Sequence, residues 1–112
     1  MYDKVKVIRR NDTRSFLEGA EYCREYISTD KLTFGTSTLL SGQKGNFDKG
    51  HPEAHEVFFV VQGTVLVHFP DSNEYVELGE YDLVFIPPSK PHEIINIGEG
   101  KAIISWSCAP KP

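Results

Sequence analysis

The residues best suited to chemistry are histidines that lie close to carboxylates. The segment 48–56 (DKGHPEAHE) contains two histidines and three carboxylates, and it directly precedes a strongly apolar stretch. A third histidine, His92, follows a proline-rich turn later in the chain. Two imidazoles and one carboxylate are a common ligand set for reactive first-row metals and leave positions open for a substrate. His51, Glu56 and His92 supply this set, so we expect a metal centre; the alternative is a polar cluster without a metal.

Strands must bring these side chains together, because they are far apart in the sequence. On a straight strand His51 and Glu56 would face opposite sides, but Pro52 argues against a regular strand there, and a turn or bulge can bring both inward. Short strands with Gly and Pro between them, spaced by roughly 8–12 residues, indicate an antiparallel sandwich or barrel. The absence of crossover helices excludes a parallel sheet. The expected strands cover residues 32–40, 56–61, 64–69, 74–78, 82–87, 92–97 and 102–106.

The first part of the chain is expected to contain a short helical turn over residues 13–19 (TRSFLEG), which Gly19 ends. A strand is expected over residues 21–28, because tyrosine and isoleucine favour strands. No internal repeat and no linker are visible. Residues 1–112 are therefore expected to form one domain.

Charge and composition exclude several function classes. The formal net charge is −4, from 12 Lys and Arg against 16 Asp and Glu, and the basic residues form no stripe. Neither a nucleic acid nor an anionic membrane is therefore an expected partner. No apolar run approaches the ~20 residues of a membrane span, and the N-terminal residues do not resemble a secretory signal, so we expect a cytoplasmic protein. In that reducing compartment Cys23 and Cys108 are expected to remain buried or half-buried thiols.

The order of these elements resembles a single-domain cupin. The first cupin motif has the pattern G-x5-H-x-H-x4-E-x6-G, and HPEAHEVFFVVQG (51–63) matches its second His, its Glu and its last Gly. The second motif has the pattern G-x5-P-x-G-x2-H-x3-N, and PPSKPHEIIN (87–96) matches its Pro, His and Asn. The two motifs then cover about residues 45–63 and 79–96. The resemblance implies an all-β, antiparallel jelly-roll or cupin β-barrel whose three expected ligands hold a divalent ion of Fe, Mn, Ni, Co or Zn.

The chain departs from the first motif at its first histidine, where Lys49 stands. A four-ligand site is thereby reduced to three ligands, unless His55 or Glu53 substitutes. Lys49 is a candidate catalytic residue that binds a substrate carboxylate or donates a proton, and His55 is a candidate acid or base beside the metal. The alternative for Lys49 is a solvated loop lysine. The alternative for His55 is a surface histidine, since neighbouring residues of a strand point to opposite faces and Glu56 is expected to point inward.

The resemblance implies a metal-dependent enzyme that acts on a small, oxygen-rich acid or sugar. Its chemistry would be Lewis-acid catalysis of the lyase, isomerase or decarboxylase type. Three alternatives stay open. They are an Fe(II)-dependent dioxygenase, a non-catalytic module that binds a small molecule, and a metal-free enzyme with His92 and Lys49 as its acid–base pair.

Two further expectations concern structure rather than chemistry. Asn96 is expected to form a hydrogen bond with the backbone that fixes the turn after His92. The stretch 56–61 (EVFFVV) is apolar on both faces, and cupins often pair through their N-terminal strands. A homodimer is therefore expected.

Overall fold

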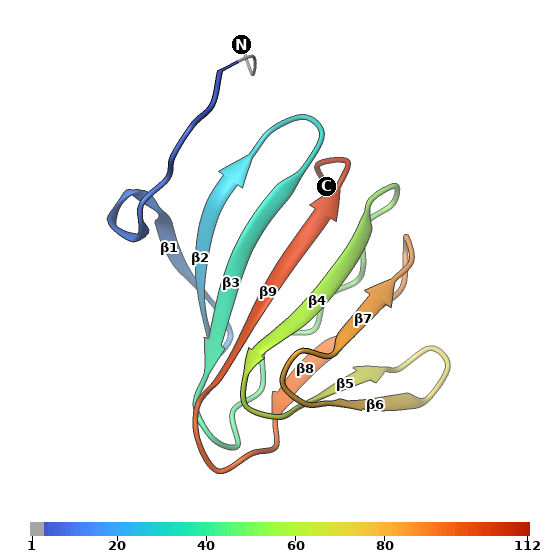
Figure 1. Cartoon of the computed structure of the whole chain (residues 1–112). Coiled ribbons are helices and arrows are strands. Elements are labelled where there is room, and N and C mark those ends of the chain that lie inside the picture. The colour runs from blue at the N-terminus through green and yellow to red at the C-terminus, as the bar shows by residue number, and fades with distance from the viewer. Residues whose placement is uncertain (1–3) are drawn as a thin grey trace.

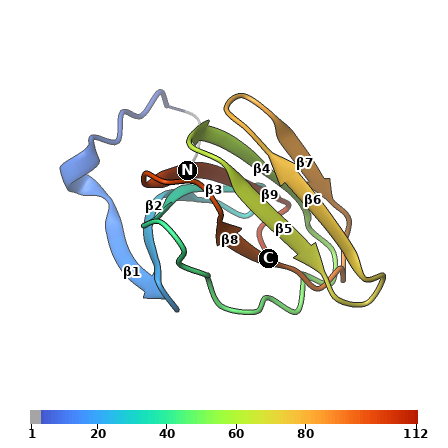
Figure 2. The same cartoon turned by 90° about the horizontal axis from the view of Figure 1, so that it is seen from below.

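The computed structural model describes residues 4–112, which form two antiparallel sheets (Figure 1, Figure 2). The larger sheet has the strand order β1-β2-β3-β9-β4-β7, and the smaller sheet has the order β6-β5-β8. This arrangement confirms the predicted all-β antiparallel barrel. Within the described range the elements are a 3-10 helix η1 (Arg10–Asp12) and the strands β1 (Arg14–Glu18), β2 (Glu21–Ser28), β3 (Thr33–Leu39), β4 (His55–Gln62), β5 (Val65–Phe69), β6 (Glu74–Leu78), β7 (Leu83–Ile86), β8 (Glu93–Asn96) and β9 (Ala102–Ala109).

The N-terminal segment differs in part from the prediction. The helical turn expected over residues 13–19 is wrong at that place, because most of this segment is β1, which pairs with β2 in a hairpin. A segment of that length is too short to hold an isolated helix, whereas pairing satisfies its backbone hydrogen-bonding groups. The helical turn lies just before it, at η1. The strand expected over residues 21–28 is confirmed as β2.

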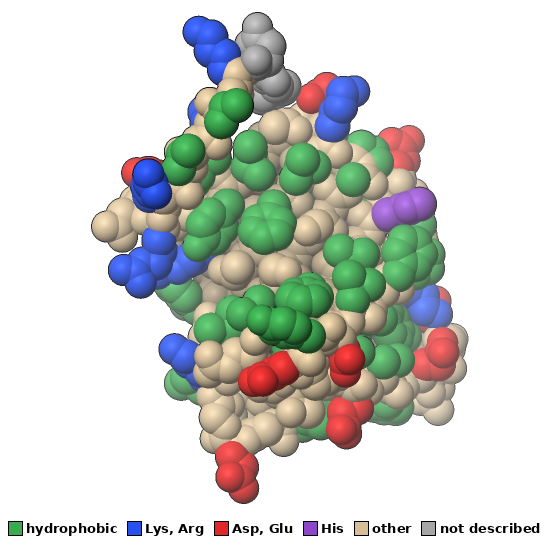
Figure 3. Space-filling view, viewed as in Figure 1, with side chains coloured by type: hydrophobic (Ala, Val, Ile, Leu, Met, Phe, Trp, Pro, Cys, Tyr) green, Lys and Arg blue, Asp and Glu red, His purple; other side chains and the backbone are tan. Residues whose placement is uncertain are grey.

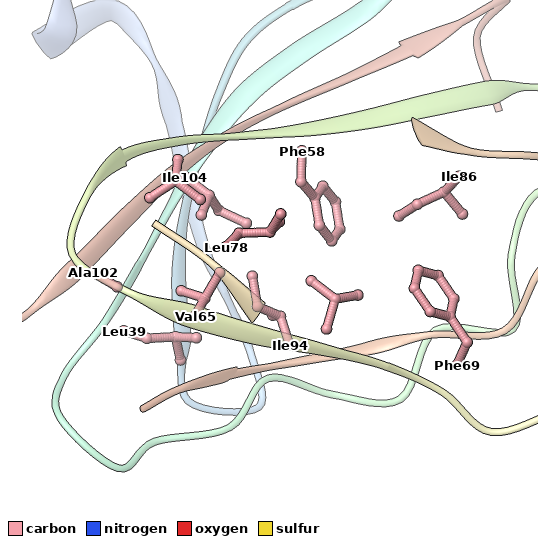
Figure 4. Close-up of a cluster of buried hydrophobic side chains, with 11 residues drawn as sticks. Leu39, Phe58, Val65, Phe69, Leu78, Ile86, Ile94, Ala102 and Ile104 are labelled. Atoms are coloured by element: carbon pink, nitrogen blue, oxygen red, sulfur yellow. The ribbon is translucent and has the colours of Figure 1, made fainter. Parts of the chain in front are cut away.

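The hydrophobic core lies between the two sheets (Figure 4). Strand β5 buries every second residue, and β4 does the same from Glu56 through Phe58 to Val60. Because side chains alternate between the two faces of a strand, Glu56 points inward with these two apolar residues. The buried cluster comprises Leu39, Phe58, Val60, Val65, Val67, Phe69, Leu78, Ile86, Ile94, Ala102 and Ile104.

The outer face of the larger sheet is also rich in apolar side chains. Figure 3 shows hydrophobic groups gathered over the strands of this sheet. Leu83 and Phe85 of β7 are both about half exposed, and they alternate with inward-facing residues. No helix within residues 4–112 is long and apolar enough to cross a membrane.

Candidate functional site

Four polar side chains from three segments of the chain meet at one end of the barrel. Glu56 lies near the start of β4, His92 directly precedes β8, and Asp48 and His51 lie in the loop between β3 and β4. Glu56 Oε1 is 3.3 Å from His92 Nε2 and 3.7 Å from His51 Nε2. Asp48 Oδ2 is 3.6 Å from His92 Nε2 and 3.9 Å from His51 Nε2. The structure thus brings together His51, Glu56 and His92, the three expected ligands. It also places beside them Asp48, which was not predicted to be a ligand.

Backbone pairing between the two loops holds this arrangement in place. The backbone N–H of Asp48 donates to the carbonyl of His92 at 2.8 Å, and the N–H of His92 donates in return at 2.9 Å. The N–H of Ser89 donates to the carbonyl of His51 at 2.7 Å. Gly50, between Asp48 and His51, has φ +92, and a Cβ there would collide with the backbone of Lys90. A glycine is therefore required where the first loop turns against the second.

The ring of His92 is oriented so that one nitrogen faces the cluster as an acceptor. Its Nδ1 lies 2.8 Å from the carbonyl oxygen of Lys90. Because a carbonyl oxygen cannot donate, Nδ1 must carry the proton, and Nε2 of the neutral ring then presents a lone pair to Glu56. Burial lowers the pKa of His92, but the Glu56 carboxylate 3.3 Å from its ring, the hydrogen bond to the Lys90 carbonyl and the negative charge of Asp48 outweigh this effect and raise the pKa overall.

Two buried atoms of the cluster have no hydrogen-bond partner among the described residues. They are Glu56 Oε1 and His92 Nε2, on side chains that are only 8% and 3% exposed. Buried polar atoms are nearly always paired, and these two point at each other at 3.3 Å. Carboxylate oxygens and neutral imidazole nitrogens facing a common point fit a divalent first-row metal. The residues present therefore suit the metal that the cupin resemblance implies.

Cys108 of β9 supports the carboxylate from behind. Its thiol donates a hydrogen bond to Glu56 Oε2 at 3.4 Å. Burial, with the nearby negative charges of Glu56 and Asp48, raises the pKa of this thiol far above its ordinary value. It therefore stays protonated and leaves Glu56 Oε1 free to face the imidazoles. Cys23 and Cys108 are both buried, free cysteines, as predicted.

Comparison with known proteins identifies the family of this chain. Residues 35–108 match the family model of the cupin domain. The chain belongs to the cupin family. A glucose-6-phosphate isomerase from Thermococcus kodakarensis is 30% identical over 77 residues, which cover 60% of this chain and 41% of the isomerase.

Solved structures share the fold of this cupin at low sequence identity. KdgF from Halomonas sp. has a TM-score of 0.81 at 16% identity and covers 97% of this chain and 96% of its own. A predicted oxalate decarboxylase from Thermotoga maritima has a TM-score of 0.79 at 16% identity, with coverages of 94% and 99%. At such identities the likeness extends to the fold alone.

The polar cluster of this cupin lines a cavity of about 440 Å³. Lys49 is exposed and also lines the cavity, so its catalytic role stays a prediction. His55 does not line it: this exposed side chain lies on the outer face of β4, with its ring edge-on to Phe85 at a centroid distance of 5.2 Å. The expectation that His55 lies beside the metal is therefore corrected, because its neighbour Glu56 takes the inward position. Glu53 is also exposed and away from this cavity.

Asn96 fixes the turn after β8 of this cupin, as predicted. Its side-chain N–H groups donate to the carbonyls of Leu39 and Gly100 at 2.9 and 2.8 Å. Its Oδ1 accepts from the N–H of Gly98 at 2.9 Å. His68 is a packed histidine whose ring stacks on Tyr75 at a centroid distance of 4.2 Å.

Sequence reasoning also missed Glu21, another acidic residue of the cavity wall. Its carboxyl group lies over Gly45, where any side chain would collide with it. Burial raises the pKa of Glu21 to about 6, a hydrogen bond with Ser37 opposes the rise, and nearby carboxylates add to it. Part of the Glu21 population is therefore protonated in mildly acidic solution.

We expect Glu21→Gln to stabilise the metal-free protein at pH 8 and to leave its stability nearly unchanged at pH 4. The pKa of Glu21 rises from 4.5 to about 6 on folding, so the folded state binds this proton more tightly and stability is lost as the pH rises between these values. The gain from the substitution is about 1–2 kcal/mol. Urea unfolding at both pH values after chelator treatment measures it. Glu99→Gln, at an exposed turn, is the control, and equal gains in both variants would contradict the prediction.

Proposed function

We propose that this cupin binds one divalent metal ion through His51, Glu56 and His92 and catalyses Lewis-acid chemistry on a small, oxygen-rich acid or sugar. The observation that carries the proposal is the buried pair Glu56 Oε1 and His92 Nε2, which lie 3.3 Å apart without other partners in the described chain. When bound, the ion would polarise a carbonyl or carboxyl oxygen of the substrate.

The chain's own residues contribute orientation and exclusion of water. The Cys108 thiol orients the Glu56 carboxylate, and the Lys90 carbonyl orients the His92 ring. Phe58 packs edge-on against His92 at a ring-centroid distance of 5.5 Å and closes the inner side of the cavity. We propose that Lys49, which lines the cavity with an exposed side chain, attracts or protonates the substrate.

The reaction types that we propose are those of a lyase, an isomerase or a decarboxylase. A cavity of about 440 Å³ suits a small molecule. The similar proteins include one named glucose-6-phosphate isomerase and one described as a predicted oxalate decarboxylase. Fold alone does not choose among these reactions, so the metal site is the part to test first.

Metal analysis of the purified, untagged protein tests the proposal. After supplementation with Fe, Mn, Ni, Co or Zn, we expect about one equivalent of metal in the wild type. His51→Ala and His92→Ala should each lose it, because each removes a neutral imidazole that faces Glu56 Oε1. The matched control is His55→Ala on the outer face, which should retain the metal. A wild type that binds none of these metals would overturn the proposal.

Loss of the first motif histidine favours a second candidate, a non-catalytic module that binds a small molecule. Lys49 stands at that position, and a chain that no longer needs a metal has no reason to preserve all of its ligands. A wild type that stays metal-free would favour this module. An Fe(II)-dependent dioxygenase is a further form of the first proposal, since two histidines and a carboxylate also suit that chemistry.

We also propose that two copies of this cupin form a homodimer. The support is the apolar outer face of the larger sheet, where Leu83 and Phe85 are 53% and 52% exposed (Figure 3). Exposed apolar side chains gathered on one face are typical of a contact between proteins.

A further inference from the structure

We propose that Asp48 is a fourth metal ligand, that the occupied centre therefore carries no net charge, and that the cavity selects uncharged, hydroxyl-rich molecules over anions. The inference rests on the proposed metal site and narrows its substrate class from an acid or sugar to the sugar-like alternative. Among the described residues, Asp48, Glu56 and His92 each place one ligand atom within 4.8 Å of the other two.

The backbone fixes Asp48 in a ligand position. Its main chain pairs with that of His92 in both directions, at 2.8 and 2.9 Å. Its Oδ1 accepts a hydrogen bond from the N–H of Gly50 at 2.8 Å. The other oxygen, Oδ2, is left facing Nε2 of His92 and of His51, at 3.6 and 3.9 Å. One carboxylate oxygen thus holds the side chain in place while the second is free to bind.

The turn at Gly50 explains how an aspartate can take the place of the missing histidine. In the cupin motif the first two ligands are two positions apart, whereas Asp48 and His51 are three apart. The left-handed conformation of Gly50, with φ +92, lets these two side chains face the same point. Lys49, between them, is exposed. His92 Nε2, which is buried and has no hydrogen-bond partner in the described chain, lies 3.6 Å from Asp48 Oδ2 and 3.3 Å from Glu56 Oε1.

The charge of the site follows from this ligand set. The two negative charges of Asp48 and Glu56 neutralise the charge of a divalent ion. A ligand set with one carboxylate and neutral imidazoles would leave a net charge of +1. The surrounding wall adds four glutamates against the single lysine Lys49 in the described lining: Glu18, Glu21, Glu25 and Glu93. An anion entering this cavity therefore meets no net positive centre and several negative groups. An uncharged molecule with hydroxyl oxygens meets no such repulsion.

Cobalt binding tests the role of Asp48 as a ligand. The visible spectrum of Co²⁺ reports its coordination, and a titration of the metal-free protein gives its affinity. We expect Asp48→Asn to weaken Co²⁺ binding at least about 10-fold, while Glu53→Gln, an exposed carboxylate of the same loop, changes nothing. Circular dichroism checks that both variants fold. Unchanged Co²⁺ affinity in a folded Asp48→Asn variant would overturn the inference, whereas a wild type that binds no Co²⁺ would instead overturn the metal site itself.

Azide, a small anion that binds open cobalt positions, tests the charge of the centre. We expect Asp48→His, which keeps four ligands but removes one negative charge, to bind azide about 10-fold more tightly than the wild type. The change in the Co²⁺ spectrum during an azide titration measures both affinities. Azide affinity in the wild type that equals or exceeds that of Asp48→His would overturn the selection against anions.

Discussion

We expect Asn96→Ala to lower the free energy of unfolding by about 3–5 kcal/mol. Asn96 is completely buried, and its amide group forms three hydrogen bonds with backbone atoms of Leu39, Gly98 and Gly100. Alanine would leave two carbonyls and one N–H without these partners, and each unpaired buried group costs about 1–3 kcal/mol. One small side chain thereby ties β8 to the end of β3 and to the turn before β9.

Chemical denaturation of the metal-free protein measures this effect. Asn96→Asp is an informative second variant, because it keeps an acceptor for Gly98 but loses both donors and buries a charge; we expect it to be no more stable than the alanine variant. Asn11→Ala serves as the control, since Asn11 is exposed in η1 and should change stability by less than about 0.5 kcal/mol. A loss of less than 1 kcal/mol in Asn96→Ala would contradict the prediction.

The second large effect is expected for Phe58→Ala, with a loss of about 3–5 kcal/mol. Phe58 is 6% exposed and belongs to the buried cluster between the sheets (Figure 4). Removing its ring opens a cavity in the core and takes away the edge-on contact with His92. We therefore expect metal affinity to fall together with stability, because the His92 ring loses one of the groups that hold it.

The next residue of β4 provides a matched control. Phe59 points to the outer face and is only partly buried, with its ring near Tyr81 at 5.5 Å. We expect Phe59→Ala to cost less than about 1.5 kcal/mol at protein concentrations that keep the chain monomeric, and to leave metal affinity unchanged. Denaturant unfolding and Co²⁺ titration compare the two variants. Equal losses would show that the inward and outward faces of β4 have been assigned incorrectly.

Most strands could be predicted from the sequence because each carries its own local signal. Runs of threonine and of β-branched, aromatic and other apolar residues favour strands at β3, β4 and β5, and glycine, proline or asparagine ends most strands. The exception is β1, whose residues 14–18 carry no strong preference. This segment is a strand because it pairs with β2. Such pairing depends on the folded chain and cannot be predicted from the residues of the segment alone.

The site was predictable only where its residues follow the cupin spacing. The positions of His51, Glu56 and His92 match that spacing, so their convergence could be anticipated. Asp48 could not be assigned, because its place depends on a backbone pairing with His92 and on the unusual φ of Gly50. The motif position itself is occupied by its neighbour Lys49, so the cupin spacing does not point to Asp48.

Strand β9 lies between β3 and β4 in the larger sheet and pairs with both along most of its length. During translation, a nascent chain that has not yet reached residue 102 therefore has two unpaired strand edges facing an empty position. Such edges are prone to pair with other chains, and pairing between segments so distant in sequence is slow. We therefore expect the larger sheet to form only after β9 has left the ribosome. This cupin should then depend on chaperones during synthesis more than a helical protein of equal length does.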